Sequence, residues 1–104
     1  MDIAKLRSQT ASARASKEAI EDAEFNDSPL RHYIDKLIKE AAKNGKYEIS
    51  PNYYYAKEFV FGYGYDGPSI DVAIRHYSNE GFSANQEHCS CNGYGVTLLI
   101  ISWK

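Results

Sequence analysis

The chain has 104 residues, with 12 Lys and Arg against 14 Asp and Glu, so its formal net charge is −2. This length is typical of one domain with a real hydrophobic core. The charge balance excludes a strongly basic surface for nucleic acid or membranes, and the longest apolar run is too short to span a bilayer. The residues after Met1 are polar and charged, so we expect no signal peptide. Two cysteines then favour free thiols in a reducing compartment.

Residues 1–27 are expected to form an extended N-terminal helical arm. The apolar side chains that recur near a 3.5-residue period are Ile3, Leu6, Ala13 and Ile20. Thr10 and Lys17 interrupt this stripe, which is too narrow to hold a helix in a core. The arm is therefore expected to form a weak coiled coil, to lie along a neighbouring subunit, or to remain a partly frayed surface helix. Ile3 and Leu6 are candidate interface residues.

A second helix is predicted over about residues 29–44. Ser28 is a suitable N-cap, and Pro29 suits the first helical position. The apolar residues at spacings i, i+4, i+7, i+8 and i+11 are Leu30, Ile34, Leu37, Ile38 and Ala41. Gly45 suits the left-handed position that ends a helix. This amphipathic pattern predicts a helix with one face in the core.

The middle of the chain predicts short elements. Residues 46–50 indicate a strand that Pro51 ends, and residues 53–61 indicate a further strand or an irregular extended loop. Residues 62–68 are a turn-rich loop, and residues 69–80 predict another helix that ends at a glycine. The side chains expected to point inward from this helix are Ile70, Ala73, Ile74 and Tyr77.

The C-terminal part predicts a hairpin of two strands, at about 82–90 and 94–103. Asn92-Gly93 between them is a strong signal for a tight turn. Alternate residues of the last strand are apolar on both faces, which is typical of a central strand covered on both sides. Two helices can cover one face, so the other face would need the N-terminal arm or a second copy of the chain.

Together these elements predict an α+β fold with a small mixed or antiparallel sheet of about three to four strands. The C-terminal strand is central, two helices pack on the sheet, and the N-terminal arm extends from it. The expected organisation is an arm over residues 1–27 and a single α+β domain over residues 28–104.

A glycine-rich segment at residues 60–67 matches the dinucleotide-binding pattern V-x-G-x-G-x-x-G. Pro68 removes an amide donor, however, and Asp66 and Asp71 would repel phosphate at the start of the next helix. The remaining chain is also too short for a doubly wound fold. We interpret the segment as a loop beside aromatic side chains, with nucleotide binding as the alternative.

Histidines and cysteines give no recognisable catalytic or metal-binding pattern. Cys89 and Cys91 share one strand face, whereas His88 points away; His76 is a possible further ligand. A structural zinc site needs four ligands, and the C-x-C spacing is not the usual C-x-x-C. We therefore expect no enzyme activity, no metal and no cofactor.

The chain contains nine tyrosines, and most of them lie in expected loops or at strand ends. The candidate interface tyrosines are Tyr53, Tyr54, Tyr55, Tyr63, Tyr65 and Tyr94. Tyrosine provides a large, rigid contact area, so this cluster favours protein–protein contact; the alternative is that the rings fill the margins of a small sheet. Binding of nucleic acid is not expected, because residues 51–104 contain only Lys57, Arg75 and Lys104 as basic residues.

Three short segments carry a resemblance to a known class of proteins: IKEAAKNGKYEI at 38–49, NEGFS at 79–83 and LIISW at 99–103. With these segments, residues 30–104 resemble short accessory and structural proteins of tailed bacteriophages. The tyrosine-rich stretch at 51–67 departs from the compact form of that class. The resemblance implies a non-enzymatic phage protein.

Within this context the expected function is a self-associating virion component of the head, neck or decoration. Its partners would be other copies of itself and other virion proteins. The alternative is a phage-encoded inhibitor that binds a host protein or a signalling nucleotide through the Tyr/Gly-rich loop 53–67. The expected location is the virion or the cytoplasm of an infected bacterium.

Overall fold

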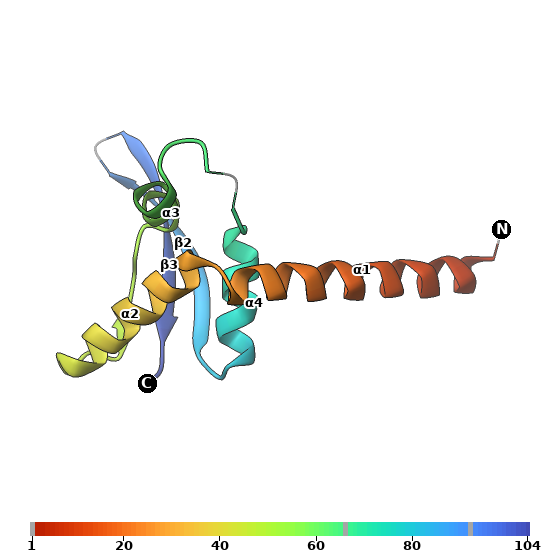
Figure 1. The fold of residues 1–104 in the computed structure, drawn as a ribbon, viewed down its shortest axis with the longest axis horizontal. Helices are drawn as coiled ribbons and strands as arrows, with labels where there is room; N and C mark the ends of the chain where they lie inside the picture. The colour runs from red at the N-terminus through yellow and green to blue at the C-terminus, as the bar shows by residue number, and fades with distance from the viewer. Residues whose placement is uncertain (1, 66, 92) are drawn as a thin grey trace.

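The computed structural model describes residues 2–65, 67–91 and 93–104 (Figure 1). The elements are α1 (Ile3–Asn26), α2 (Pro29–Lys43), β1 (Glu48–Ile49), α3 (Tyr53–Phe61), α4 (Ile70–Asn79), β2 (Ser83–Cys91) and β3 (Tyr94–Ser102). The strands form an antiparallel sheet in the order β1-β3-β2. The predicted α+β class, the central C-terminal strand and the N-terminal helix are confirmed.

The prediction for residues 53–61 is wrong, because this segment is the helix α3 and neither a strand nor an extended loop. Asn52 starts the helix: its side-chain oxygen accepts a hydrogen bond from the amide of Tyr55 at 3.3 Å. Tyr53 and Ala56 are three residues apart, so they lie on one side of the helix, and both are buried. Burial of this face outweighs the strand preference of the aromatic residues.

The helix α2 begins and ends as its sequence predicts. The Ser28 hydroxyl donates to the carbonyl of Phe25 at 2.7 Å and accepts from the amide of Arg31 at 3.2 Å, which fixes the corner between α1 and α2. At the other end, the amides of Gly45 and Lys46 donate back to carbonyls of the last helical turn. Gly45 has φ +79°, the left-handed conformation that this type of helix end requires.

The hairpin of β2 and β3 sets the register of the sheet, from Ser83 opposite Ser102 to Cys91 opposite Tyr94. The tight turn predicted at Asn92-Gly93 involves Asn92, which lies outside the described residues. On its second edge, β3 pairs with β1, where Ile49 is opposite Ile101. The strand predicted at 46–50 is present in the structure, but it is only two residues long.

One face of the sheet packs on helices and forms the core. Leu99 and Ile101 on this face are fully buried. The helix residues buried in the same cluster are Phe25, Leu30, Ile34, Ala41, Tyr53, Ala56, Ile70, Val72, Ala73 and Tyr77. On the opposite face, Val96, Leu98 and Ile100 are half-buried. The N-terminal helix extends away from the sheet and does not lie over this face (Figure 1).

The helix α1 gives the molecule an elongated shape, with extents of 55 × 32 × 24 Å. The radius of gyration is 16.3 Å, whereas a compact chain of this length has about 13 Å. Phe25, near the C-terminal end of α1, is fully buried in the core. The rest of α1 projects outward from this attachment (Figure 1).

Candidate functional site

An exposed group of aromatic rings lies over α3 and the neighbouring part of α2. We call this group, Tyr33, Tyr55 and Phe59, the aromatic surface. Tyr55 is 64 % exposed and Phe59 is 68 % exposed. Their rings stack with centroids 6.3 Å apart, and the Phe59 ring lies 6.2 Å from that of Tyr33 on α2. Exposed aromatic rings held together in this way are typical of protein-binding surfaces.

The buried side of α3 holds the aromatic surface in place. The hydroxyl of Tyr53 donates to the carbonyls of Pro68 at 2.8 Å and Ser69 at 3.2 Å, so α3 is tied to the chain just before α4. Burial raises the pKa of Tyr53 above its usual range, with smaller effects from Tyr54 and Tyr65. Tyr53 therefore stays protonated and keeps donating at any pH near neutrality.

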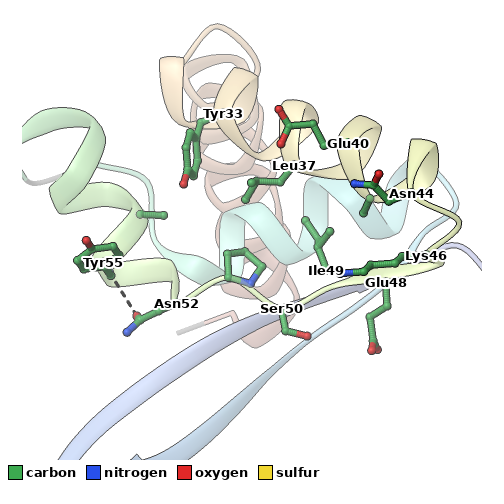
Figure 2. Close-up of a pocket in the computed structure, with 13 residues that line it drawn as sticks. Tyr33, Leu37, Glu40, Asn44, Lys46, Glu48, Ile49, Ser50, Asn52 and Tyr55 are labelled. Atoms are coloured by element: carbon green, nitrogen blue, oxygen red, sulfur yellow. Dashed lines mark hydrogen bonds between the residues drawn. The ribbon is translucent and has the colours of Figure 1, made fainter.

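A cavity of about 500 Å³ adjoins the aromatic surface (Figure 2). It lies between α2 and the chain that leads from β1 into α3. Tyr33 and Tyr55 are at one end, Leu37 and Ile49 lie along its sides, and Lys46 is at the other end (Figure 2). The cavity has the size of a small ligand pocket, and its apolar walls suit a protruding side chain of a partner protein.

Acidic residues give the rim of this cavity a preference for positive charge. Glu40 and Glu48 both line the cavity, against a single lysine, Lys46. A partner that inserts an apolar or aromatic side chain here would meet these carboxylates at its edges. The chemistry of the cavity therefore favours an apolar group next to a basic residue.

The second candidate surface is the free part of α1, which we define as residues 2–20. Every residue in this segment is exposed, including Ile3 at 63 %, Leu6 at 42 % and Ile20 at 61 %. Asp2 caps the helix by accepting hydrogen bonds from the amides of Ala4 and Lys5. The apolar side chains of this segment pack against no other part of the described chain, so the free part of α1 is a candidate contact surface.

Ion pairs hold the other end of α1 to α4. Arg75 on α4 lies 2.7 Å from Oδ1 of Asp22 and 3.6 Å from Oε2 of Glu21. The hydrogen bond to Asp22 is the main cause of the raised pKa of Arg75. The attachment is therefore fixed in direction, so the free part of α1 is held outward by the fold itself.

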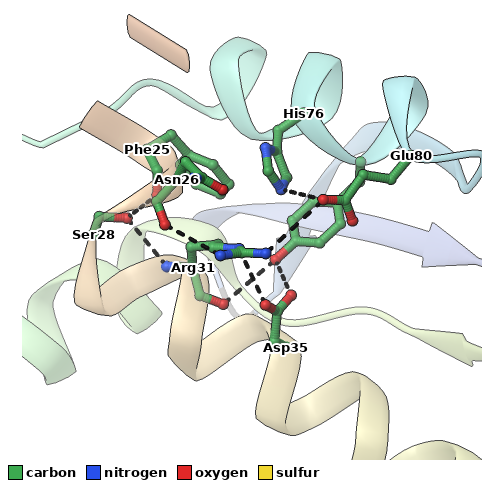
Figure 3. Close-up of polar contacts among 8 residues, drawn as sticks. Phe25, Asn26, Ser28, Arg31, Asp35, His76 and Glu80 are labelled. Atoms are coloured by element: carbon green, nitrogen blue, oxygen red, sulfur yellow. Dashed lines mark hydrogen bonds and ion pairs between the residues drawn. The ribbon is translucent and has the colours of Figure 1, made fainter. Parts of the chain in front are cut away.

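A polar network strengthens the same junction among α1, α2 and α4 (Figure 3). His76 packs against Phe25 with ring centroids 4.9 Å apart, and its Nε2 lies 3.1 Å from Oε1 of Glu80. Arg31 pairs with Oδ2 of Asp35 on the same helix, α2, at 3.2 Å, and it lies 3.9 Å from Oε1 of Glu80 at the end of α4. These groups are used in packing and pairing, which gives them a structural role at the base of α1.

The structure separates the tyrosines that the sequence groups together. Tyr54, Tyr55 and Tyr63 are exposed, whereas Tyr53 is fully buried and offers no free surface. The ring of Tyr65 stacks on that of Phe61 with centroids 3.7 Å apart. The side chain of Tyr94 lies outside the described residues. Ile3 and Leu6 are exposed on the free part of α1.

Two contributors to the aromatic surface, Tyr33 and Phe59, were missed by the sequence reasoning. Phe59 reaches the surface because α3 is a helix, which places it one turn from Tyr55. Tyr33 lies beside the inward stripe of α2 and packs partly against the core. Tyr55 and Phe59 are four residues apart, and this spacing places two side chains next to each other when the segment is a helix.

The motifs that suggested chemistry have ordinary surroundings. The glycine-rich segment follows the helix α3, so it lacks the strand that a dinucleotide fingerprint requires. Nδ1 of His88 lies 3.0 Å from Oγ1 of Thr97 on the paired strand, and Cys89 is a free, half-buried thiol. Among the described residues, no group of three or more His, Cys, Asp and Glu side chains is placed to hold a metal ion.

Neither the hydropathy of the helices nor comparison with known proteins assigns a further function to the chain. None of the helices in the described ranges combines the length and the apolar character needed to cross a membrane. Comparison of the chain with protein-family models, curated proteins and solved structures gives no match.

Proposed function

We propose that this chain is a non-enzymatic, self-associating structural protein that acts through protein–protein contacts. The virion of a tailed bacteriophage, as a head, neck or decoration component, is the setting that the sequence resemblance suggests. The partners would be further copies of the chain and other virion proteins.

The observation that carries self-association is the exposed, rigidly attached helix α1. Its residues 2–20 are all exposed, and the ion pairs of Arg75 with Asp22 and Glu21 hold its base in one direction. An arm of this kind binds a neighbouring copy at little cost in conformational entropy, because it is already helical before binding. The exposed apolar residues Ile3, Leu6 and Ile20 supply the contact area.

Sedimentation velocity of the full chain over a range of concentrations tests this proposal. We expect a concentration-dependent oligomer, and we expect Ile3→Gln with Leu6→Gln to shift it toward monomer. Ala4→Gln with Ala15→Gln is the matched control on the opposite face of the helix. A chain that stays monomeric at every concentration would overturn self-association. A chain that is absent from purified phage particles would overturn the virion assignment.

The aromatic surface favours a second candidate, a phage-encoded inhibitor that binds one host protein. Tyr55 lines the cavity with its acidic rim, and Phe59 stacks on Tyr55; this surface suits an apolar anchor with a neighbouring basic group. A pull-down that recovers one stoichiometric host protein with the natural chain, and not with Tyr55→Ser and Phe59→Ser, would support this function. Equal recovery with both chains would contradict it.

A further inference from the structure

We propose that the free part of α1 of one copy docks into the cavity between α2 and the β1–α3 segment of a second copy. Each copy then gives one helix and receives another, so the contact joins two different surfaces. This inference rests on the proposed self-association and names both of the surfaces that meet.

One face of the free part of α1 combines apolar and basic side chains. The residues that lie together on this face include Ile3, Leu6, Arg7 and Arg14. Ile3 is 63 % exposed and Leu6 is 42 % exposed, so both are available for a contact. Residues 3–17 contain four basic residues and no acidic residue. The face therefore presents apolar groups next to positive charge.

The cavity offers the matching apolar surface (Figure 2). Leu37 and Ile49 lie along its sides, and the ring of Tyr55 lies at one end. Its volume of about 500 Å³ is that of a small ligand pocket, which is large enough for aliphatic side chains such as those of Ile3 and Leu6. Burial of these side chains would provide most of the stability of the contact.

The carboxylates of the cavity are available to a basic partner. Glu40 and Glu48 line the cavity, and neither forms an ion pair with another described residue. The acidic residues at the base of α1 differ, because Glu21 and Asp22 are already paired with Arg75. Charge complementarity therefore selects the cavity, and not the α1 of the second copy, as the site that receives the basic helix.

Lysines near the cavity weaken this attraction. Lys46 lines the cavity, so the lining residues carry one positive charge against two negative ones. The lysines at positions 36, 39 and 43 are exposed on α2 and do not line the cavity. Their flexible stems allow the ammonium groups to turn away from an incoming arginine. The charges of the lining residues then decide which face of the helix turns toward the cavity.

The α1 helix of the same chain does not reach this cavity. The buried Phe25 and the ion pair of Asp22 with Arg75 hold its base against α4. Ile3 lies about 33 Å from Phe25 along the helix axis. This free end points away from α2 and α3 (Figure 1). In a self-associating chain, the helix that fills the cavity must therefore come from a second copy.

The proposed contact is heterologous, because a helix of one copy meets a cavity of another. Such a contact repeats until a ring closes, of which a reciprocal dimer is the smallest, or it continues as a filament. A contact in which α1 pairs with α1 would instead use the same surface on both copies. The two arrangements predict different behaviour when variants of the two surfaces are mixed.

Complementation between two variants of the full chain tests the contact. The helix variant carries Ile3→Gln with Leu6→Gln, and the cavity variant carries Glu40→Arg with Glu48→Arg. All four residues are exposed, so the fold should be retained, and circular dichroism verifies this. We expect each variant alone to associate at least about tenfold more weakly than the natural chain in sedimentation velocity.

An equimolar mixture of the two variants should form a dimer that contains one chain of each. The unchanged helix of the cavity variant fits the unchanged cavity of the helix variant, and no other complementary pair of surfaces remains. Native mass spectrometry with a mass-tagged helix variant identifies this mixed dimer. Glu24→Arg with Glu87→Arg is the matched control, because it makes the same change of charge outside the cavity and should associate like the natural chain.

The outcomes separate this inference from the proposed function. Normal association of the cavity variant alone would leave the cavity to a different partner and overturn the inference, while self-association stands. Two weakly associating variants that form no mixed dimer would also overturn it. Weak association of the control would show a general effect of charge and overturn the assignment of the cavity. A natural chain that is monomeric at every concentration would overturn both proposals.

Discussion

The hydroxyl of Tyr77 donates a hydrogen bond to Oδ1 of Asp35 at 2.9 Å, and this contact joins α4 to α2 inside the core. Tyr77 is fully buried and packs edge-to-face against Phe25 and Phe82. A second, longer hydrogen bond runs from the same hydroxyl to the carbonyl of Arg31 at 3.5 Å, so these polar contacts lie at the junction where α1 is attached.

Tyr77→Phe removes this hydrogen bond and keeps the ring in place. The Asp35 carboxylate then loses a buried donor, so we expect the free energy of unfolding to fall by about 1–3 kcal/mol. Urea unfolding followed by circular dichroism measures the change. Tyr47→Phe is the matched control, because Tyr47 is 58 % exposed. Equal values for the two variants would show that the hydrogen bond to Asp35 adds nothing.

Alkaline pH is expected to destabilise the fold through two buried tyrosines. Burial raises the pKa of Tyr53, and burial with the hydrogen bond to Asp35 raises that of Tyr77. Above about pH 10 each tyrosine ionises in the unfolded chain but stays protonated in the folded one. The unfolded state then binds fewer protons, so stability falls by about 1.4 kcal/mol per pH unit for each group.

Urea unfolding between about pH 9 and 11.5 measures this slope. Tyr77→Phe should remove one of the two contributions, so the variant loses stability less steeply than the natural chain. Parallel slopes for Tyr77→Phe and the natural chain would contradict the raised pKa.

Neighbouring residues of β3 are expected to differ in their contribution to stability. Leu99 is fully buried against the helices, whereas Ile100 lies on the opposite face and is half-buried. Leu99→Ala should cost about 2–5 kcal/mol, because it leaves a cavity in the core. Ile100→Ala should cost less than half of that. Thermal and urea unfolding compare the two, and a larger loss for Ile100 would mean that its face is covered in solution.

Local signals in the sequence predicted the elements whose ends depend on single residues. Ser28 and Gly45 bound α2 as expected, because a cap and a left-handed residue act locally. The segment 53–61 was mispredicted because its helical state depends on burial of Tyr53 and Ala56 against the rest of the fold. Asn52 as a cap was the local signal, and the strand preference of three adjacent tyrosines obscured it.

The candidate site was predictable only in part for the same reason. Ile3 and Leu6 were identified because a thin stripe on a polar helix is visible in the sequence. Which tyrosine is exposed depends on the rotation of α3, which propensity does not determine. Tyr53 points inward, whereas Phe59 points outward. The attachment of α1 depends on the burial of Phe25 and on ion pairs between Arg75 and residues 21–22, long-range contacts that no local pattern reveals.

The three consecutive tyrosines of α3 provide an internal comparison. Tyr53 is fully buried, Tyr54 is 49 % exposed and Tyr55 is 64 % exposed. Tyr53→Ala should cost about 3–5 kcal/mol of unfolding free energy, as for other large buried aromatic residues. Tyr55→Ala should change it by less than about 1 kcal/mol. Chemical unfolding of the two single variants decides this, and equal losses would mean that α3 is not the helix described.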